Sequence, residues 1–164
     1  PSHLGTLPVL FRTFPDARVV VTHRDPAVAQ ASVTNLLGTL YWMRSGKAFD
    51  AGAFESLMTP QSGAARLAGV IALIESGAVP RAPIHNFRYV DMIDNPLAAL
   101  RTLYHDVGLE LSDAALAGMR DYLSHKPQGK FGKHRYSVGE QQENARKRAF
   151  FRRYQEYFNC PDET

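Results

Sequence analysis

The sequence predicts an α/β fold in which helices flank a parallel sheet, and three observations lead to this prediction. Residues 17–22 include three consecutive valines, which is typical of a buried strand. Asp25-Pro26 follows this run, and an aspartate before a proline favours the start of a helix. Residues 84–89 alternate apolar and polar side chains and also lead to a helix start, Asn95-Pro96. Strands that alternate with helices indicate a parallel sheet.

The composition is that of an ordinary globular domain. The chain has 164 residues, of which 45% are hydrophobic and 21% are charged, so we expect a single domain. No apolar run approaches the roughly 18 residues that a membrane span needs. The N-terminus has no signal-peptide pattern and the single cysteine, Cys160, cannot form a disulfide framework, which favours a cytoplasmic location. The net charge of +3 and isoelectric point of 9.2 suit an anionic ligand but do not indicate nucleic acid.

The first part of the chain is predicted to form a helix, a strand and a longer helix. Apolar side chains from Leu4 to Phe14 recur at helical spacing, and Pro8 fits only if it lies in the first turn. The longer helix is predicted to run from Pro26 to about Tyr41. Its apolar stripe is expected to be core and consists of Val28, Ala29, Ser32, Val33, Leu36, Leu37 and Leu40. The aromatic side chains near the loop that follows, Trp42 and Phe49, either pack together or line an acceptor pocket.

The rest of the chain shows further helix starts and stops. Starts are predicted at Thr59-Pro60, at Asn95-Pro96 and at Ser112, and stops at Gly77, Gly108 and Pro127. A last helix is predicted over residues 139–158. Its basic side chains are typical of a solvated face and are Arg146, Lys147, Arg148, Arg152 and Arg153.

A candidate phosphate site follows the first strand. Arg24 lies at the carboxyl end of that strand, where open α/β sheets bind ligands, and the next helix directs its N-terminal dipole there. Ser32 follows eight residues later along that helix. A guanidinium and a hydroxyl so placed can hold one phosphate between them. The alternative is a solvated arginine and a serine that the helix merely tolerates.

A second basic stretch has the composition of an anion-binding loop. Residues 126–136 contain three lysines and an arginine around two glycines, which let the backbone turn its N–H groups toward an anion. The candidate binding residues in this loop are Lys130, Gly132 and Lys133. A solvated basic loop is the alternative.

Several motifs together resemble the C-terminal two-thirds of a PAPS-dependent sulfotransferase. They are His3-Leu4, Phe14-Pro15-Asp16-Ala17-Arg18, Thr22-His23-Arg24-Asp25-Pro26 with Ser32, and Tyr89-Val90-Asp91-Met92-Ile93-Asp94-Asn95-Pro96. The resemblance implies a three-layer P-loop-type fold, a parallel sheet flanked by helices. It also implies the transfer of a sulfuryl group from 3′-phosphoadenosine-5′-phosphosulfate (PAPS) to a hydroxyl or amine. By the same resemblance, the acceptor would be a small molecule or a macromolecule.

The resemblance also implies roles for single residues. Arg24 and Ser32 would bind the 3′-phosphate of the cofactor, Tyr89 would contact its adenine, and the basic loop with Lys130, Gly132 and Lys133 would close over the 3′-phosphate. His3 would act as general base on the acceptor, a task that suits an imidazole at neutral pH. A core tyrosine and a loosely held terminal histidine are the alternatives.

A glycine-rich phosphate loop followed by Lys and Ser/Thr, which the family carries near its start, occurs nowhere in the sequence. We therefore expect residues 1–164 to be the C-terminal part of one sulfotransferase domain, whose natural partner is the missing N-terminal segment. Alone, this part should be inactive and aggregation-prone. The scattered histidines show no metal-ligand spacing, so we expect no metal site.

Two other functions remain open at this point. A fragment of a P-loop kinase-like phosphotransferase would share the order of strands and helices, but it should carry catalytic aspartates, whereas Asp25 and Asp91 read as cap and turn residues. A non-enzymatic module could bind acidic partners through the basic helix, and its binding would then be sensitive to salt.

Overall fold

The computed structural model describes residues 2–50, 52, 59–126 and 141–163. Its elements, in chain order, are the 3₁₀ helix η1 (Ser2–Thr6), α1 (Leu7–Thr13), β1 (Val19–His23), α2 (Pro26–Ser45), α4 (Pro60–Glu75), β2 (Ile84–Arg88), α5 (Tyr89–Asp94), α6 (Pro96–Asp106), α7 (Asp113–His125) and α8 (Gln141–Phe158).

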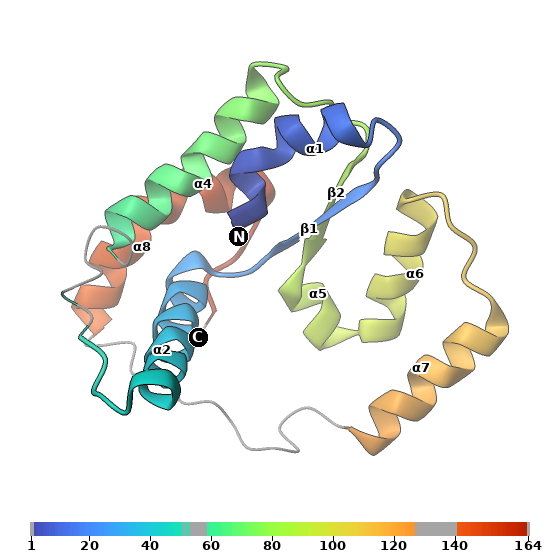
Figure 1. Ribbon diagram of the computed structural model, residues 1–164. Coiled ribbons are helices and arrows are strands. Elements are labelled where there is room, and N and C mark those ends of the chain that lie inside the picture. Colours follow the sequence, from blue (N-terminus) through green and yellow to red (C-terminus); the bar gives the residue numbers. More distant parts are fainter. Residues whose placement is uncertain (1, 51, 53–58, 127–140, 164) are drawn as a thin grey trace.

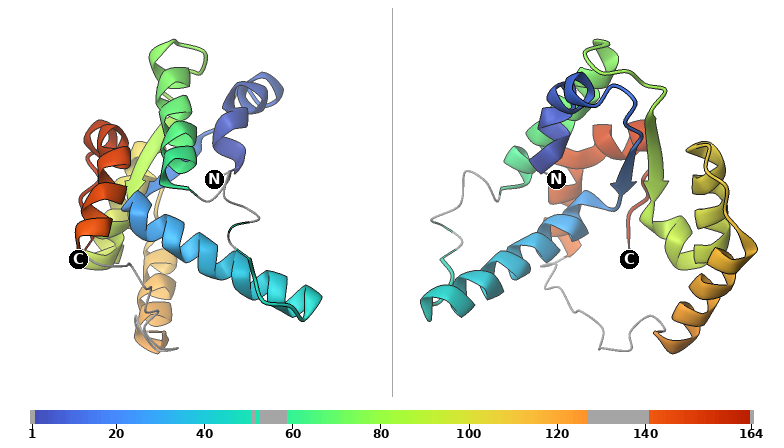
Figure 2. Two further views of the ribbon diagram at one scale, coloured as in Figure 1. Left: turned by 90° about the vertical axis from the view of Figure 1, so that its left-hand side faces the viewer. Right: turned by 45° about the vertical axis from the view of Figure 1, so that its right-hand side comes forward.

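Within the described residues the sheet consists of β1 and β2, which run parallel. Val19 lies opposite Ile84 and His23 lies opposite Arg88, so both strands end together at what we call the carboxyl end of the sheet. Helices lie on both sides of the strands, with α1, α4 and α8 on one side and α6 on the other (Figures 1 and 2). The predicted α/β class with a parallel sheet between helical layers is therefore confirmed.

The hydrophobic core lies between the sheet and the helices α1, α4 and α8. Its buried members are Leu7, Phe11, Val70, Ile71, Ile74, Val79, Tyr154 and Phe158. The helical spacing in the first segment therefore marks a face that is buried at Leu7 and Phe11, and Pro8 lies in the first turn of α1 as predicted. Phe14 differs from the prediction, because it follows the end of α1 and is 60% exposed. Because α1 runs back along β1, η1 lies toward the carboxyl end of the sheet (Figure 1).

The predicted helix starts are confirmed by side-chain caps. Asp25, Thr59, Asn95 and Ser112 each accept a hydrogen bond from a backbone N–H in the first turn of the helix that follows. Gly77 and Gly108 have φ angles of 72° and 65°, a conformation that favours glycine after a helix.

Three further details differ from the sequence predictions. The helix α2 continues past Tyr41 to Ser45, where Gly46 ends it with a φ of 65°. Its apolar stripe is not core: none of the seven stripe residues is buried, and Val33, Leu36 and Leu40 are exposed where α2 extends away from the sheet (Figure 2). Tyr89 begins the short helix α5 rather than ending β2.

No helix among the described residues has the length and apolarity to cross a membrane.

Candidate functional site

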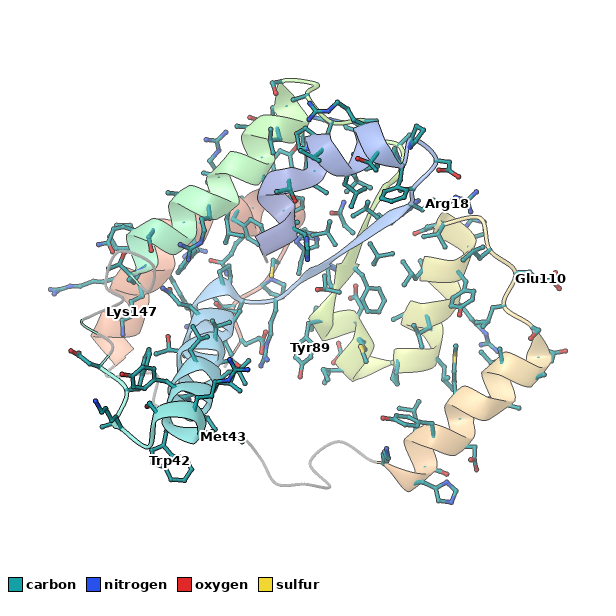
Figure 3. All side chains as sticks on the ribbon, in the orientation of Figure 1. Arg18, Trp42, Met43, Tyr89, Glu110 and Lys147 are labelled. Atoms are coloured by element: carbon teal, nitrogen blue, oxygen red, sulfur yellow. The ribbon has the colours of Figure 1, made fainter. Side chains whose placement is uncertain are left out.

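The carboxyl end of the sheet brings Arg24 and Tyr89 together. Arg24 follows β1 and Tyr89 follows β2, and the residues that precede them, His23 and Arg88, are partners in the sheet register. The guanidinium carbon of Arg24 lies 4.3 Å from the centroid of the Tyr89 ring, which is a cation–π contact. Figure 3 shows Tyr89 at the point where β2 passes into α5. Two of the predicted site residues are therefore in direct contact.

Arg24 also contributes to a group of donors that we call the anion cradle: Nε and Nη2 of Arg24 and the backbone N–H of Asp25. In the structure the cradle holds the carboxylate of Glu163. Nε of Arg24 donates to both carboxylate oxygens, at 2.9 and 3.0 Å, and Nη2 donates to Oε2 at 2.8 Å. The N–H of Asp25 donates to Oε1 at 3.2 Å. This arrangement places a bidentate anion at the start of α2, where the helix dipole stabilises negative charge.

The carboxylate of Asp25 is buried, and both of its oxygens accept hydrogen bonds. Its Oδ1 caps α2 by accepting from the N–H of Ala27 at 2.9 Å. Its Oδ2 accepts from Nε and Nη2 of Arg148, at 3.2 and 2.9 Å, and from the N–H of Glu163 at 3.0 Å. A buried carboxylate needs such partners, because leaving it uncompensated would be costly. Asp25 thus ties α2, α8 and the C-terminal segment together.

The surroundings of Arg148 differ from those that the sequence predicts. The basic side chains of α8 were expected to form a solvated face, but the side chain of Arg148 is only 23% exposed and pairs with buried Asp25. Arg153 of the same helix pairs with Glu75 of α4 at 3.0 Å. The two ion pairs connect α8 to the start of α2 and to α4, so two of its arginines contribute to the tertiary structure.

A buried polar network lies directly before Arg24. His23 is 1% exposed, and its ring stacks on Phe158 with centroids 4.2 Å apart. Its Nδ1 lies 2.6 Å from the hydroxyl of Tyr154 and its Nε2 lies 2.8 Å from Oδ1 of Asn86. Burial lowers the pKa of His23 more than the bond to Asn86 raises it, and burial raises the pKa of Tyr154. A neutral imidazole therefore accepts from Tyr154 at Nδ1 and donates to Asn86 from Nε2.

The C-terminal tail, residues 159–163, lies along the carboxyl end of the sheet. Nη1 of Arg88 donates to the carbonyl oxygen of Asn159 at 3.4 Å, while Nε and Nη2 of Arg88 bind Asp91, which raises the pKa of Arg88. Nε2 of Gln155 donates to Oδ1 of Asp162 at 2.7 Å. Burial, as the largest cause, raises the pKa of the Cys160 thiol to about 11, so this thiol stays protonated at neutral pH.

The other predicted site residues lie in different surroundings. Ser32 is half-buried in α2, two turns after the cap. His3 is exposed in η1, and its carbonyl oxygen accepts from the Thr6 hydroxyl at 3.0 Å. The predicted loop residues Lys130, Gly132 and Lys133 lie outside the described part of the chain. Among the described residues, no cluster of three or more His, Cys, Asp or Glu side chains is arranged to hold a metal ion.

Aromatic side chains from the last part of α2 and from the segment that follows it lie close together. The rings of Tyr41 and Phe49 meet edge to face, with centroids 5.8 Å apart. Trp42 and Phe49 line a shallow hollow together with Thr34, Asn35, Gly38 and Thr39. Trp42 is 61% exposed and lies with Met43 at the end of α2 that is far from the sheet (Figure 3).

Comparison with known proteins bears on both fold and family. The model of the sulfotransferase family matches residues 1–113, a range that includes His3, Arg24, Ser32 and Tyr89. Among solved structures, the chain is similar to the sulfotransferase STF9 from Mycobacterium avium, with 23% sequence identity and a TM-score of 0.68. The similarity covers 98% of this chain and 41% of that chain, so this chain spans less than half of the solved structure. No curated protein matches the sequence significantly.

Proposed function

The chain belongs to the sulfotransferase family, and on this premise we propose that it binds a phosphate group of PAPS in an enzyme that transfers a sulfuryl group to a hydroxyl or amine. The observation that supports the proposal best is the anion cradle. Its donors already hold two anionic oxygens at the carboxyl end of the sheet. Open α/β sheets bind their ligands at this end.

The cradle has the chemistry that a phosphate ester needs. A guanidinium matches two oxygens of a phosphate as well as it matches those of a carboxylate. The N–H of Asp25 lies at the start of α2, whose N-terminal dipole favours an anion. The residues present therefore fit the 3′-phosphate of PAPS.

The roles of the other residues come from the family to which the chain belongs. Arg24 would bind the 3′-phosphate with Ser32, and the basic loop with Lys130, Gly132 and Lys133 would add further cations. Tyr89 would contact the adenine. Because Arg24 already covers one face of the Tyr89 ring, we expect the adenine at the other face or at the ring edge. The donor supplies the sulfuryl group, and this chain supplies charge and alignment.

His3 would supply the base. As the acceptor oxygen bonds to sulfur, the acceptor proton would pass to the imidazole, and the electron pair of the breaking sulfur–oxygen bond would stay on the departing nucleotide phosphate. Adenosine 3′,5′-bisphosphate is then the second product. The acceptor is a hydroxyl or amine of a small molecule or a macromolecule.

The proposal is tested by calorimetry of adenosine 3′,5′-bisphosphate binding to the complete gene product. We expect Arg24→Ala to weaken binding by about 1.5–3 kcal/mol, the worth of hydrogen bonds to a charged group. Arg120→Ala, at an exposed position of α7, is the matched control and should bind as the wild type does. A wild-type protein that binds no bisphosphate, or an Arg24→Ala variant that binds it equally well, would refute the proposal.

A further inference from the structure

Glu163 occupies the anion cradle in the structure. Its carboxylate accepts from Nε and Nη2 of Arg24 and from the N–H of Asp25, which are the donors that the proposed function assigns to a phosphate. A carboxylate and a phosphate cannot share these donors, because two anions at one site repel each other. Binding of a phosphate at the cradle therefore requires the carboxylate of Glu163 to leave.

The backbone of Glu163 is fixed independently of its side chain. The N–H of Glu163 donates to Oδ2 of Asp25 at 3.0 Å, and Nη2 of Arg148 donates to the carbonyl oxygen of Glu163. The side chain carries three rotatable bonds beyond these anchors. It can therefore leave the cradle by rotation while the C-terminal tail stays in place.

The ion pair between Arg24 and Glu163 is open to solvent. The two side chains are 30% and 25% exposed, so water and a dissolved anion can reach the pair. A partly exposed pair contributes less than a fully buried one, since solvent screens it. The carboxylate is thus bound firmly enough to occupy the cradle and weakly enough to be displaced.

We propose that Glu163 is an internal competitor that sets the affinity and the selectivity of the cradle for phosphate. The proposal rests on the proposed function, because it takes the cradle to be the site of the 3′-phosphate. A ligand that merely replaces the carboxylate makes the same number of charged hydrogen bonds and gains little. A nucleotide with a 3′-phosphate also makes contacts through its other groups and therefore displaces the carboxylate. Its apparent affinity is the affinity for the empty cradle, reduced by the fraction of molecules in which Glu163 occupies the cradle.

The test compares Glu163→Gln with Glu156→Gln in the complete gene product. The amide has the shape of the carboxylate but no charge, and the backbone anchors of residue 163 remain. We expect Glu163→Gln to bind adenosine 3′,5′-bisphosphate about three- to tenfold more tightly than the wild type. Adenosine 5′-monophosphate, which lacks the 3′-phosphate, should bind both proteins equally. Glu156, at an exposed position of α8, is the matched control and should show no change.

Two further variants complete the experiment. Glu163→Asp keeps the charge but shortens the side chain, and we expect it to tighten bisphosphate binding as well. In an Arg24→Ala background the effect of Glu163→Gln should vanish, because the two residues act on one site. If the wild type binds bisphosphate and Glu163→Gln binds it equally or more weakly, the competitor role is wrong and the proposed function stands. If no variant binds bisphosphate, both are wrong.

Discussion

The hydroxyl of Tyr154 lies 2.6 Å from Nδ1 of His23 in the protein interior and connects residues 131 positions apart. His23 is the last residue of β1 and Tyr154 belongs to α8, while the other nitrogen of His23 contacts Asn86 of β2. Three elements therefore meet in one buried network immediately before Arg24. We infer that this network fixes the strand end from which Arg24 reaches the cradle.

Tyr154→Phe should destabilise the protein. The substitution removes only the hydroxyl and leaves Nδ1 of buried His23 without its donor, which costs about 1–3 kcal/mol of the free energy of unfolding. Urea unfolding of the complete gene product measures this change. Tyr122→Phe is the control, because Tyr122 is 58% exposed, and it should have no measurable effect. Equal stability of the two variants would show that the network contributes nothing.

Stability should fall as the pH is lowered through the neutral range, and His23 is the cause. Burial holds the pKa of folded His23 below its ordinary value of 6.5. Below that value the unfolded state binds a proton that the folded state does not, so the free energy of unfolding falls by up to about 1.4 kcal/mol per pH unit. The loss stops once the pH is below the pKa of the folded protein.

Urea unfolding between about pH 7.5 and 5.5, a window around the ordinary histidine value, measures this dependence. His23→Gln should flatten it, because the amide does not titrate. A variant with the same slope as the wild type would assign the dependence to another group.

Arg148→Met should destabilise the protein by about 3 kcal/mol, because it leaves the buried carboxylate of Asp25 without its cation. Arg146→Met is the control, since Arg146 is an exposed arginine of the same helix. Thermal unfolding of both variants measures the difference. Similar midpoints would mean that water replaces Arg148 at Asp25 and that the pair is unimportant.

The sequence predicted the elements well where their signals are local. The caps at Asp25, Thr59, Asn95 and Ser112 are hydrogen bonds over two or three residues, so residue types at fixed spacing reveal them. The contact between Arg24 and Tyr89 could also be inferred from the sequence, because each residue follows a strand of a parallel pair. The six-residue helix α5 was missed, since it has no side-chain cap at its start.

The sequence did not predict the partners of the site. Glu163 reaches Arg24 across 139 positions and Arg148 reaches Asp25 across 123. No spacing rule covers such distances, and an acidic residue, like an arginine in a basic helix, is typical of solvated surface. The exposed stripe of α2 was missed for a similar reason, because periodicity identifies an apolar face but not what covers it.

Substitution of His3 should separate the chemical step from nucleotide binding. If His3 is the general base, His3→Ala should lower kcat by about a hundredfold and leave the affinity for adenosine 3′,5′-bisphosphate unchanged, because the cradle lies at Arg24. Steady-state sulfuryl transfer and calorimetry on the complete gene product measure the two quantities. His105→Ala is the matched control, since His105 is an exposed histidine in the last turn of α6. An unchanged kcat in His3→Ala would assign the proton to another group, and a parallel loss of bisphosphate affinity would place His3 in the structure of the binding site instead.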